Sequence, residues 1–545
     1  MACDIHLDDA LDAQDKKGVV LGVRRRWFPV SPSSLHSPFK VALKTPFKRS
    51  ISEIEILRQL TTRTDSGRRI HSGVTSRKAT LLLAFRLPLA KTRVRRSFLN
   101  MTLNKYVFVW LGIVLATVST ASAEWKEKVL YSFQGGTDGA YPAGGVVFDK
   151  QGNLYGATQQ GGGTNCSPMA ACGTIYQLAP PKKLGDPWTE TILHLFQGKQ
   201  HHDGEFPSGG VIVDALGNIY GTSSYGGTGD CVLLGIKGGC GTVFELSPPQ
   251  TKGGKWTYTI LYSFKGGKDG YLPFGDLVFD GAGNLYGVTY FGGGKGTTCN
   301  PYYQYCGTVF ELSPPKIKGG KWTEKVLHSF AGGTDGANPN GGLALDSKSN
   351  VYGTTNIGGY EGGQCGPQGC GTAFELKPPA TKGGAWAEKQ LHTFAGGNDG
   401  AVPVAGMILG SNGNLYGITV GTLFRLSPPS PKSRRWRETI LYTFNGCGTG
   451  CDPEGKLILD GSGKLYGTTY SAQSVSGTVF RLTPPGSKGG DWSLSLLYGF
   501  KGTPDGAQPA AGLVFDKVGN LYSTTTKGGT GTCSFGCGAV FKVWP

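Results

Sequence analysis

The sequence predicts an all-β protein, a seven-bladed β-propeller with four strands in each blade. Three observations support this prediction: a composition rich in turn formers, a sequence unit that occurs seven times, and four strand-like elements in each unit. Of the 545 residues, 90 are Gly and 31 are Pro, while 38% are hydrophobic. That composition is too apolar for a disordered chain and too rich in turn formers for a helical one.

The repeat is marked by a Trp that is followed five residues later by a Leu-x-x-Phe string. The first copy, at Trp125, continues with LYSF at Leu130, and each copy spans about 60 residues. The seven Trp residues are Trp125, Trp188, Trp256, Trp322, Trp386, Trp436 and Trp492.

Each repeat contains four short elements. The Trp-to-Phe string comes first, and an apolar alternation such as Gly144–Asp149 comes second. A GNLYG-type string such as 152–156 is third, and a GTVFEL-type string such as 307–312 is fourth. All are β-branched and aromatic-rich and are bounded by Gly, Pro, Asn or Asp, which are strand signals. Four strands per repeat predict propeller blades; an open β-solenoid, the alternative, usually has shorter repeats.

The order of the elements predicts the topology of a blade. The short apolar strand should be innermost and line the channel, the GNLYG and GTVFEL strands should follow outward, and the Trp-containing strand should form the rim. The chain starts with an outer strand, Trp125–Phe133, and ends with a third strand, Gly538–Val543. We expect these two strands to join in the last blade, which closes the ring and leaves no unpaired edge at the seam.

Two segments precede the repeats. Residues 1–100 hold 20 Lys and Arg but 8 Asp and Glu, and we interpret them as a disordered basic leader or an over-extended start. Residues 101–123 have the features of a signal peptide, with a lysine, the apolar stretch Tyr106–Val118 and an A-x-A cleavage site. That stretch is shorter than the ~20 residues needed to span a bilayer. The alternative is a signal anchor with a basic cytosolic tail. The expected mature propeller is 124–545.

The distribution of charge argues against a nucleic-acid partner. The chain has a net charge of +17, but most of the basic excess lies in residues 1–100. The repeats are therefore close to electrically balanced, and we expect no binding to nucleic acid.

Cysteine usage supports export. Twelve of the 13 Cys lie in the repeats and form six closely spaced pairs. Such pairs in an exported chain predict disulfides that close small loops, whereas a zinc site would need further ligands beside each pair. The predicted disulfides are Cys166/Cys172, Cys231/Cys240, Cys299/Cys306, Cys365/Cys370, Cys447/Cys451 and Cys533/Cys537.

With these motifs in view, the chain resembles the choice-of-anchor tandem repeat GloVer-containing proteins of bacteria. The strings D-x-x-G-N-L-Y-G and G-T-V-F-E-L-x-P-P carry the resemblance, and they recur through Trp125–Pro545. The resemblance implies an exported, surface-associated repeat protein. Many family members have a C-terminal sorting tail, but this sequence ends in Val-Trp-Pro, so we expect no covalent or membrane anchor.

The predicted topology gathers the seven GG-x-D-G-type loops on one face of the disc, near the mouth of the channel. Their carboxylates could hold a cation, with calcium the one cofactor considered, or a cationic ligand. Alternatively, each Asp accepts hydrogen bonds within its own turn. These candidate metal ligands are Asp138, Asp203, Asp269, Asp335, Asp399, Asp452 and Asp505. The opposite face carries Lys-rich PP-x-x-KGG-x-W loops and is predicted to be basic.

Departures from the repeat are better candidates for ligand binding than its symmetric features. The second repeat alone has adjacent histidines, His201 and His202, which suit metal or acid–base chemistry. The third repeat places Tyr302, Tyr303 and Tyr305 inside the Cys299/Cys306 loop. Aromatic rings held by a disulfide suit the stacking of sugar rings, although they also suit packing over a neighbouring blade.

The sequence contains none of the motifs that mark common catalytic sites, such as a nucleophile elbow, a zinc-protease helix or a phosphate-binding loop. We therefore expect a monomeric, non-catalytic binding or scaffold propeller that is secreted, periplasmic or at the cell surface. Its expected partner is an envelope or environmental polysaccharide or a surface protein. Two alternatives stay open: a polysaccharide lyase or glycoside hydrolase that uses His201 or His202, and a passive surface-layer protein.

Overall fold

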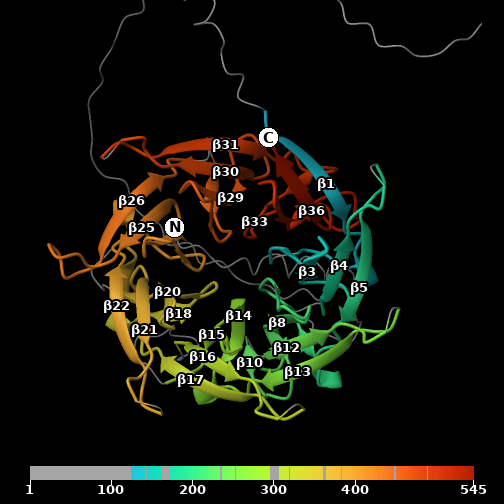
Figure 1. The fold of residues 1–545 in the computed structure, drawn as a ribbon, viewed down its shortest axis with the longest axis horizontal. Helices are drawn as coiled ribbons and strands as arrows, with labels where there is room; N and C mark the ends of the chain where they lie inside the picture. Colours follow the sequence, from blue (N-terminus) through green and yellow to red (C-terminus); the bar gives the residue numbers. More distant parts are fainter. Residues whose placement is uncertain are drawn as a thin grey trace, which may run out of the picture. The chain divides into compact units, whose positions relative to one another are not determined.

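The computed structural model describes residues 124–545 apart from 143, 163–171, 184, 234–235, 252, 295–305, 318, 360–363, 382, 447, 449 and 488. The predicted leader, 1–100, and signal peptide, 101–123, lie outside the described residues, so both stay predictions. Within the described residues, seven antiparallel sheets of four or five strands follow one another around a ring (Figure 1). This arrangement confirms the seven-bladed propeller.

Strand order within a blade also follows the prediction, from the Gly-rich apolar string on the inside to the Trp-containing string at the rim. The innermost strands of blades 1 to 7 are β2 (Val147–Phe148), β7 (Ile212–Val213), β14 (Tyr271–Phe279), β19 (Ala344–Leu345), β23 (Ile408–Leu409), β28 (Ile458–Leu459) and β33 (Val514–Phe515). The second strands are β3 (Leu154–Thr158), β8 (Ile219–Ser223), β15 (Leu285–Phe291), β20 (Val351–Ile357), β24 (Leu415–Thr419), β29 (Leu465–Ser471) and β34 (Leu521–Thr525).

The strands of the two outer layers are more uniform in length. The third strands are β4 (Thr174–Ala179), β12 (Thr242–Ser247), β16 (Thr308–Ser313), β21 (Thr372–Lys377), β25 (Thr422–Ser427), β30 (Thr478–Thr483) and β36 (Ala539–Trp544). The outermost strands of blades 1 to 7 are β5 (Thr189–Leu195), β13 (Thr257–Ser263), β17 (Thr323–Ser329), β22 (Ala387–Thr393), β26 (Arg437–Thr443), β31 (Ser493–Gly499) and β1 (Lys126–Ser132).

Short strands and single helical turns lie at one end of the blades. The additional strands are β6 (Gly204–Glu205), β9 (Tyr225–Gly226), β10 (Val232–Leu233), β11 (Ile236–Lys237), β18 (Ala337–Pro339), β27 (Cys451–Pro453), β32 (Gly506–Ala507) and β35 (Lys527–Gly528). The helices are single 3-10 turns: η2 (Gly136–Asp138), η3 (Lys199–His201), η4 (Gly267–Asp269), η5 (Gly333–Asp335), η6 (Gly366–Gln368) and η7 (Gly397–Asp399). No helix in the described part of the chain has the length and apolarity needed to cross a membrane.

The ring closes as the sequence predicts. The N-terminal strand β1 pairs antiparallel with the C-terminal strand β36, from Lys126 opposite Trp544 to Ser132 opposite Ala539. Figure 1 shows the two ends of the propeller side by side, with β1 in blue and β36 in red. The last blade is therefore built from both ends of the propeller, and its sheet has no unpaired edge at the seam.

Aromatic rings join neighbouring blades. The Phe that ends each Leu-x-x-Phe string packs edge-to-face on the aromatic ring of the next blade's third strand, as Phe264 does on Phe310 at 5.2 Å. All seven interfaces repeat this contact, with centroids 4.9 to 5.7 Å apart. Gly287 opposes Phe310 on the neighbouring strand, where a Cβ would lie 2.5 Å from the ring. The glycine of the GNLYG string thus makes room for the aromatic core.

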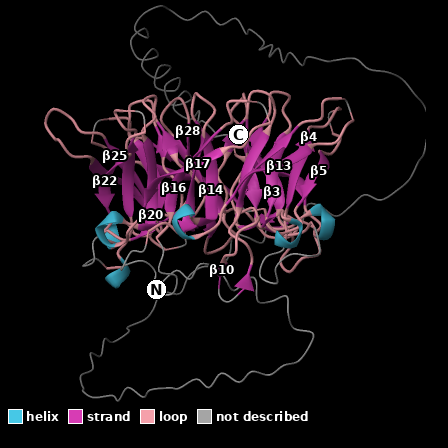
Figure 2. Ribbon diagram, turned by 90° about the horizontal axis from the view of Figure 1, so that it is seen from below, coloured by secondary structure: helices cyan, strands magenta, loops and turns pink. Residues whose placement is uncertain are grey.

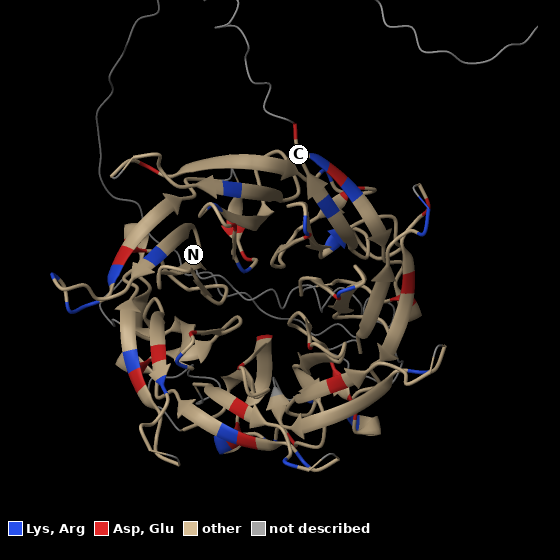
Figure 3. Cartoon of the chain, in the orientation of Figure 1, with Lys and Arg blue, Asp and Glu red and all other residues tan. Residues whose placement is uncertain are grey.

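The two faces of the disc differ. Figure 2 shows the 3-10 turns gathered at one end of the strands, which we call the helix face, and long loops at the other end, which we call the hairpin face. The hairpin face carries the PP-x-x-KGG-x-W loops, and Figure 3 shows Lys and Arg on the loops that project from the ring. Among the described residues of these loops, the exposed basic ones include Lys182, Lys183, Lys255, Lys316, Lys321, Lys432, Arg434 and Arg435.

Three of the predicted disulfides are formed between described residues, namely Cys231–Cys240, Cys365–Cys370 and Cys533–Cys537. Three further cysteines, Cys172, Cys306 and Cys451, are also disulfide-bonded. Their predicted partners, Cys166, Cys299 and Cys447, lie outside the described residues.

Candidate functional site

The two loop sites predicted from departures in the repeat have different outcomes. Tyr302, Tyr303 and Tyr305 lie outside the described residues, so the sugar-stacking platform stays a prediction. His201 ends η3, His202 follows it in the left-handed conformation, and both side chains are exposed. The adjacent Asp203 is buried, and its Oδ2 lies 3.0 Å from Nε2 of His194.

Six of the seven aspartates of the GG-x-D-G loops, all except Asp452, lie against the outermost strands. Asp138 accepts hydrogen bonds from the Tyr131 hydroxyl on β1 and, at 2.6 Å, from the backbone N–H of Gln134. Asp269, Asp335, Asp399 and Asp505 repeat this arrangement with a Tyr or His of their own outer strands. Asp452 differs, because it accepts a hydrogen bond from Ser471 instead.

The expected position near the channel mouth is therefore wrong for the six aspartates other than Asp452. In each GG-x-D-G-x-x-P loop, the Asp comes before the segment that runs inward to the innermost strand. The carboxylates of these loops therefore lie at the outer part of the helix face. Each of these six accepts a hydrogen bond from a backbone N–H of its own turn. A role of the seven carboxylates as calcium ligands stays a prediction.

A second carboxyl approaches most of these aspartates from the next blade. It belongs to a Glu two residues after the repeat Trp, as in Glu127 beside Asp505. Burial, and then the charge of Asp505 and a hydrogen bond to it, raise the pKa of Glu127 to about 8. Burial and the charge of the neighbouring Asp likewise raise the pKa values of Glu190 and Glu324 to about 7. A Glu with a raised pKa beside an Asp of the preceding blade thus recurs around the ring.

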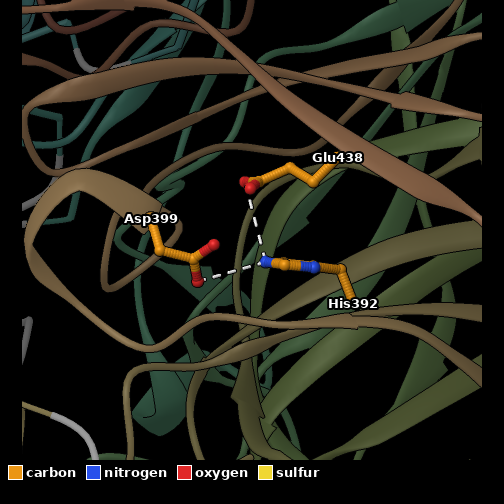
Figure 4. Close-up of side chains that lie close together, drawn as sticks. All are labelled: His392, Asp399 and Glu438. Carbon is orange, nitrogen blue, oxygen red and sulfur yellow. Dashed lines mark hydrogen bonds and ion pairs between the residues drawn. The ribbon is translucent and has the colours of Figure 1, made fainter.

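One of these interfaces brings three metal-ligating groups together. His392 on β22, Asp399 on η7 and Glu438 on β26 of the next blade point toward one another (Figure 4). Nε2 of His392 lies 3.2 Å from Oδ2 of Asp399 and 3.6 Å from Oε1 of Glu438. Burial, and then the hydrogen bond with Asp399, raise the pKa of Glu438 to about 9. Burial lowers the pKa of His392, although Asp399 opposes that shift.

The central channel contains a cavity of about 630 Å³. Its walls come from the innermost strands and include the apolar side chains of Ile212, Ile408, Ile458, Val514 and Phe515. One ring of channel positions is almost all glycine: Gly145, Gly210, Gly342, Gly406 and Gly512, each four residues before the end of the inner-strand string. The ring is tight, because a Cβ on Gly406 would lie 1.7 Å from the carbonyl oxygen of Gly342.

Two charged residues interrupt this glycine ring. Asp276 stands at that position in blade 3 and Lys456 in blade 6, and they are the charged residues among the described ones that line the cavity. Asp276 Oδ1 accepts a hydrogen bond of 2.7 Å from the N–H of Gly210 in blade 2. Lys456 extends toward blade 4, where a Cβ on Gly342 would lie 3.3 Å from its Nζ. The ion pairs among the described residues do not include one between Asp276 and Lys456.

Sequence reasoning missed this channel site, although its signal was present. Five of the inner-strand strings begin GG or AG, whereas the other two begin GD at Gly275-Asp276 and GK at Gly455-Lys456. The sites predicted from the sequence lay in unusual loops, whereas these two departures are single residues within strand strings. Asp276 and Lys456 become a candidate site only because both line the same cavity.

Comparisons with solved structures find other proteins at low similarity. An aldose sugar dehydrogenase from Streptomyces coelicolor in its PQQ-bound form is 12% identical, with a TM-score of 0.36, over 77% of this chain and 98% of that one. A "putative oxidoreductase (glucose dehydrogenase)" from a Thermus species is 14% identical, with a TM-score of 0.37, over 77% and 100%. A NanB sialidase variant from Streptococcus pneumoniae is 13% identical, with a TM-score of 0.34, over 76% and 70%. We draw no functional conclusion from similarity at this level.

Comparison with curated proteins found no match. The family description "Gloeobacter/Verrucomicrobia repeat", in contrast, matches residues 112–300 and 234–434, which together cover more than half of the chain. These matches include the repeats that build the first blades, and they agree with the resemblance noted from the sequence motifs. The chain therefore belongs to the Gloeobacter/Verrucomicrobia repeat family.

Proposed function

We propose that this protein is an exported, non-catalytic binding propeller of the bacterial cell envelope, and that its central cavity holds an acidic sugar unit of an envelope or environmental polysaccharide. The observation that carries this proposal is the replacement of two channel glycines by Lys456 and Asp276. A symmetric scaffold needs neither charge, whereas a ligand site needs a few polar groups in an otherwise apolar cavity.

The dimensions and walls of the cavity suit a sugar. A volume of about 630 Å³ lies within the range of about 300 to 1,000 Å³ that is usual for small-molecule pockets. The aliphatic side chains of Ile212, Ile408 and Ile458 offer apolar surface to the C–H faces of a sugar ring. Gly145, Gly210 and Gly512 of the glycine ring also line the cavity.

The two charged groups suit an acidic sugar in particular. Lys456 has no ion-pair or hydrogen-bond partner within the described part of the chain, and it is half-buried. A sugar carboxylate would supply the missing counter-charge in a partly dehydrated setting, where a charge-assisted hydrogen bond is strong. Asp276, already fixed by Gly210, can accept a hydrogen bond from a sugar hydroxyl.

Export is supported by the cysteines. Nine described Cys residues of the propeller are disulfide-bonded, and such bonds persist in oxidising compartments. The signal peptide that would direct export remains a prediction. Nothing in the described residues favours the lyase or hydrolase alternative, because His201 and His202 do not line the cavity.

The proposal is tested by titration calorimetry with protein produced in an oxidising compartment. The probe is a short uronic-acid oligosaccharide, compared with the same oligosaccharide as its neutral methyl ester. We expect the acid to bind and the ester to bind at least ten-fold more weakly, because one charge-assisted hydrogen bond contributes about 1.5 to 3 kcal/mol. Lys456→Met should weaken binding of the acid by a similar factor.

The matched control is Lys432→Met, which removes an exposed lysine of a hairpin-face loop and should leave binding unchanged. Unchanged melting temperatures show that the variants are folded. Equal binding of acid and ester, or equal binding by Lys456→Met and the unmodified protein, would refute the channel site. If neither sugar binds and the propeller captures an acidic surface protein instead, the polysaccharide proposal is wrong and the partner is a protein.

A further inference from the structure

Three metal-ligating side chains lie close together at the interface between the outermost strands of blades 4 and 5, closer than at any other interface among the described residues. Three elements meet there: β22 supplies His392, the turn η7 supplies Asp399, and β26 supplies Glu438. Figure 4 shows one ring nitrogen of His392 facing the carboxyl groups of both Asp399 and Glu438. One nitrogen and two carboxylate oxygens from three separate segments form a donor set that borderline transition metals accept.

The distances suit a single ion. Ligands at about 2.0 to 2.1 Å around a tetrahedral zinc ion lie about 3.3 Å from one another. His392 Nε2 lies 3.2 Å from Asp399 Oδ2 and 3.6 Å from Glu438 Oε1, and all three ligand atoms lie within 4.8 Å of one another. An ion could therefore bind after sub-ångström adjustment of the side chains.

The site also has an unsatisfied atom and an opening. Oε1 of Glu438 is inaccessible to solvent and accepts no hydrogen bond. The Glu438 side chain is 12% exposed, whereas that of Asp399 is 31% exposed, so the cluster is reached from the Asp399 side. A buried carboxyl oxygen without a hydrogen-bond donor is costly, and a bound cation, which would displace the carboxyl proton of Glu438, would remove that cost.

The repeat itself provides the comparison. At the position of His392, blades 2, 6 and 7 have Tyr262, Tyr498 and Tyr131, whose hydroxyls donate to the local Asp. Blade 1 has His194, but Tyr258 stacks on it at 3.8 Å in the place of the Glu.

Blade 3 comes closest to the His392 arrangement. It has His328 and Asp335, with Glu388 on the outer strand of blade 4. These groups do not gather as closely, since the described residues contain one cluster of at least three ligating groups within 4.8 Å.

We propose that His392, Asp399 and Glu438 form a binding site for one divalent transition-metal ion, Zn²⁺ by preference, with solvent in the fourth position. The bound ion links blade 4 to blade 5 and stabilises that interface. The site is separate from the channel cavity and does not depend on the function proposed for it.

The test uses untagged protein that has been dialysed against EDTA and then freed of the chelator. Titration calorimetry with ZnCl₂ alone should give one equivalent per chain with a micromolar or tighter dissociation constant. Zinc should also raise the melting temperature. The variant His392→Tyr introduces the side chain found at this position in four other blades, so it should fold normally, and it should lose the zinc equivalent and the thermal shift.

Two controls separate this site from other histidines. His328→Tyr makes the same replacement in blade 3 and should retain one equivalent of zinc. The double variant with His201→Ala and His202→Ala should retain it as well, which excludes binding by the exposed pair. Absence of stoichiometric zinc binding by the unmodified protein, or binding that survives His392→Tyr, would overturn the proposal.

Discussion

Replacing Glu127 by Gln should make the thermal stability of the propeller less sensitive to pH. Glu127 lies on β1, the strand that closes the ring, and faces Asp505 of the preceding blade. Its carboxyl carries a proton in the folded protein near neutral pH, because its pKa is raised from 4.5 to about 8. Gln is neutral at every pH and has nearly the same shape.

The sign of this pH dependence follows from the raised pKa of Glu127. The raised pKa stabilises the folded state fully below pH 4.5, where Glu127 is protonated in both states. This stabilisation is lost as the pH rises through about 8, since burial and then the charge of Asp505 disfavour the ionised carboxyl. Stability of the unmodified protein should therefore fall between about pH 5.5 and about pH 9.

The magnitude is small but measurable. Between these two pH values, the pKa shift of Glu127 would lower the free energy of unfolding by roughly 3 kcal/mol if the carboxyl were fully shielded from solvent. Glu127 is half-buried and partly screened by solvent, so we discount this to about 1 to 2 kcal/mol. With an unfolding entropy of about 2.1 cal/mol/K per residue over the propeller, this corresponds to a change of about 1 to 2 °C in melting temperature.

Differential scanning calorimetry at these two pH values measures the effect. The fall in melting temperature between them should be about 1 to 2 °C smaller for Glu127→Gln than for the unmodified protein. Glu124→Gln changes an exposed carboxyl three residues away and should behave like the unmodified protein. Identical pH dependence in all three proteins would refute the idea that this carboxyl is protonated at the interface.

Other parts of the scaffold give three further predictions. Gly406→Ala should destabilise the fold by more than about 1 kcal/mol in urea unfolding, because its Cβ would overlap the carbonyl oxygen of Gly342, whereas Gly281→Ala, with open space around it, should not. Phe310→Ala should cost about 3 to 5 kcal/mol in the same assay, since it removes a fully buried ring from a blade interface. Deleting Lys126–Ser132 should open the seam, expose the edge of the last blade and produce aggregation on size-exclusion chromatography.

Much of the fold could be predicted from the sequence because blades are local structures. The strings at Gly144–Asp149 and Leu130 recur with the same neighbours, so their strands, order and inside-to-outside layering follow from short-range patterns. Closure by β1 and β36 followed from the order of elements at the two ends. The three confirmed disulfides could be predicted for the same reason, since each joins cysteines a few residues apart.

Contacts between blades could not be predicted in the same way. The sequence placed Asp399 near the channel mouth, but the structure places it against His392 at the rim and beside Glu438 of the next blade. The string W-x-E, which supplies these glutamates, is visible in the sequence. Its partner is not, because that pairing depends on the angle and offset at which two separate sheets pack.

The sequence by itself thus determined that the chain forms a propeller, which strings form its strands, and how the ring closes. It did so because each of these features rests on hydrogen bonding and side-chain alternation within one repeat. Only the tertiary structure decided that Asp276 and Lys456 share one cavity and that Lys456 extends toward Gly342 two blades away. Closing seven twisted sheets around one axis brings distant residues together, and no local pattern encodes that distance.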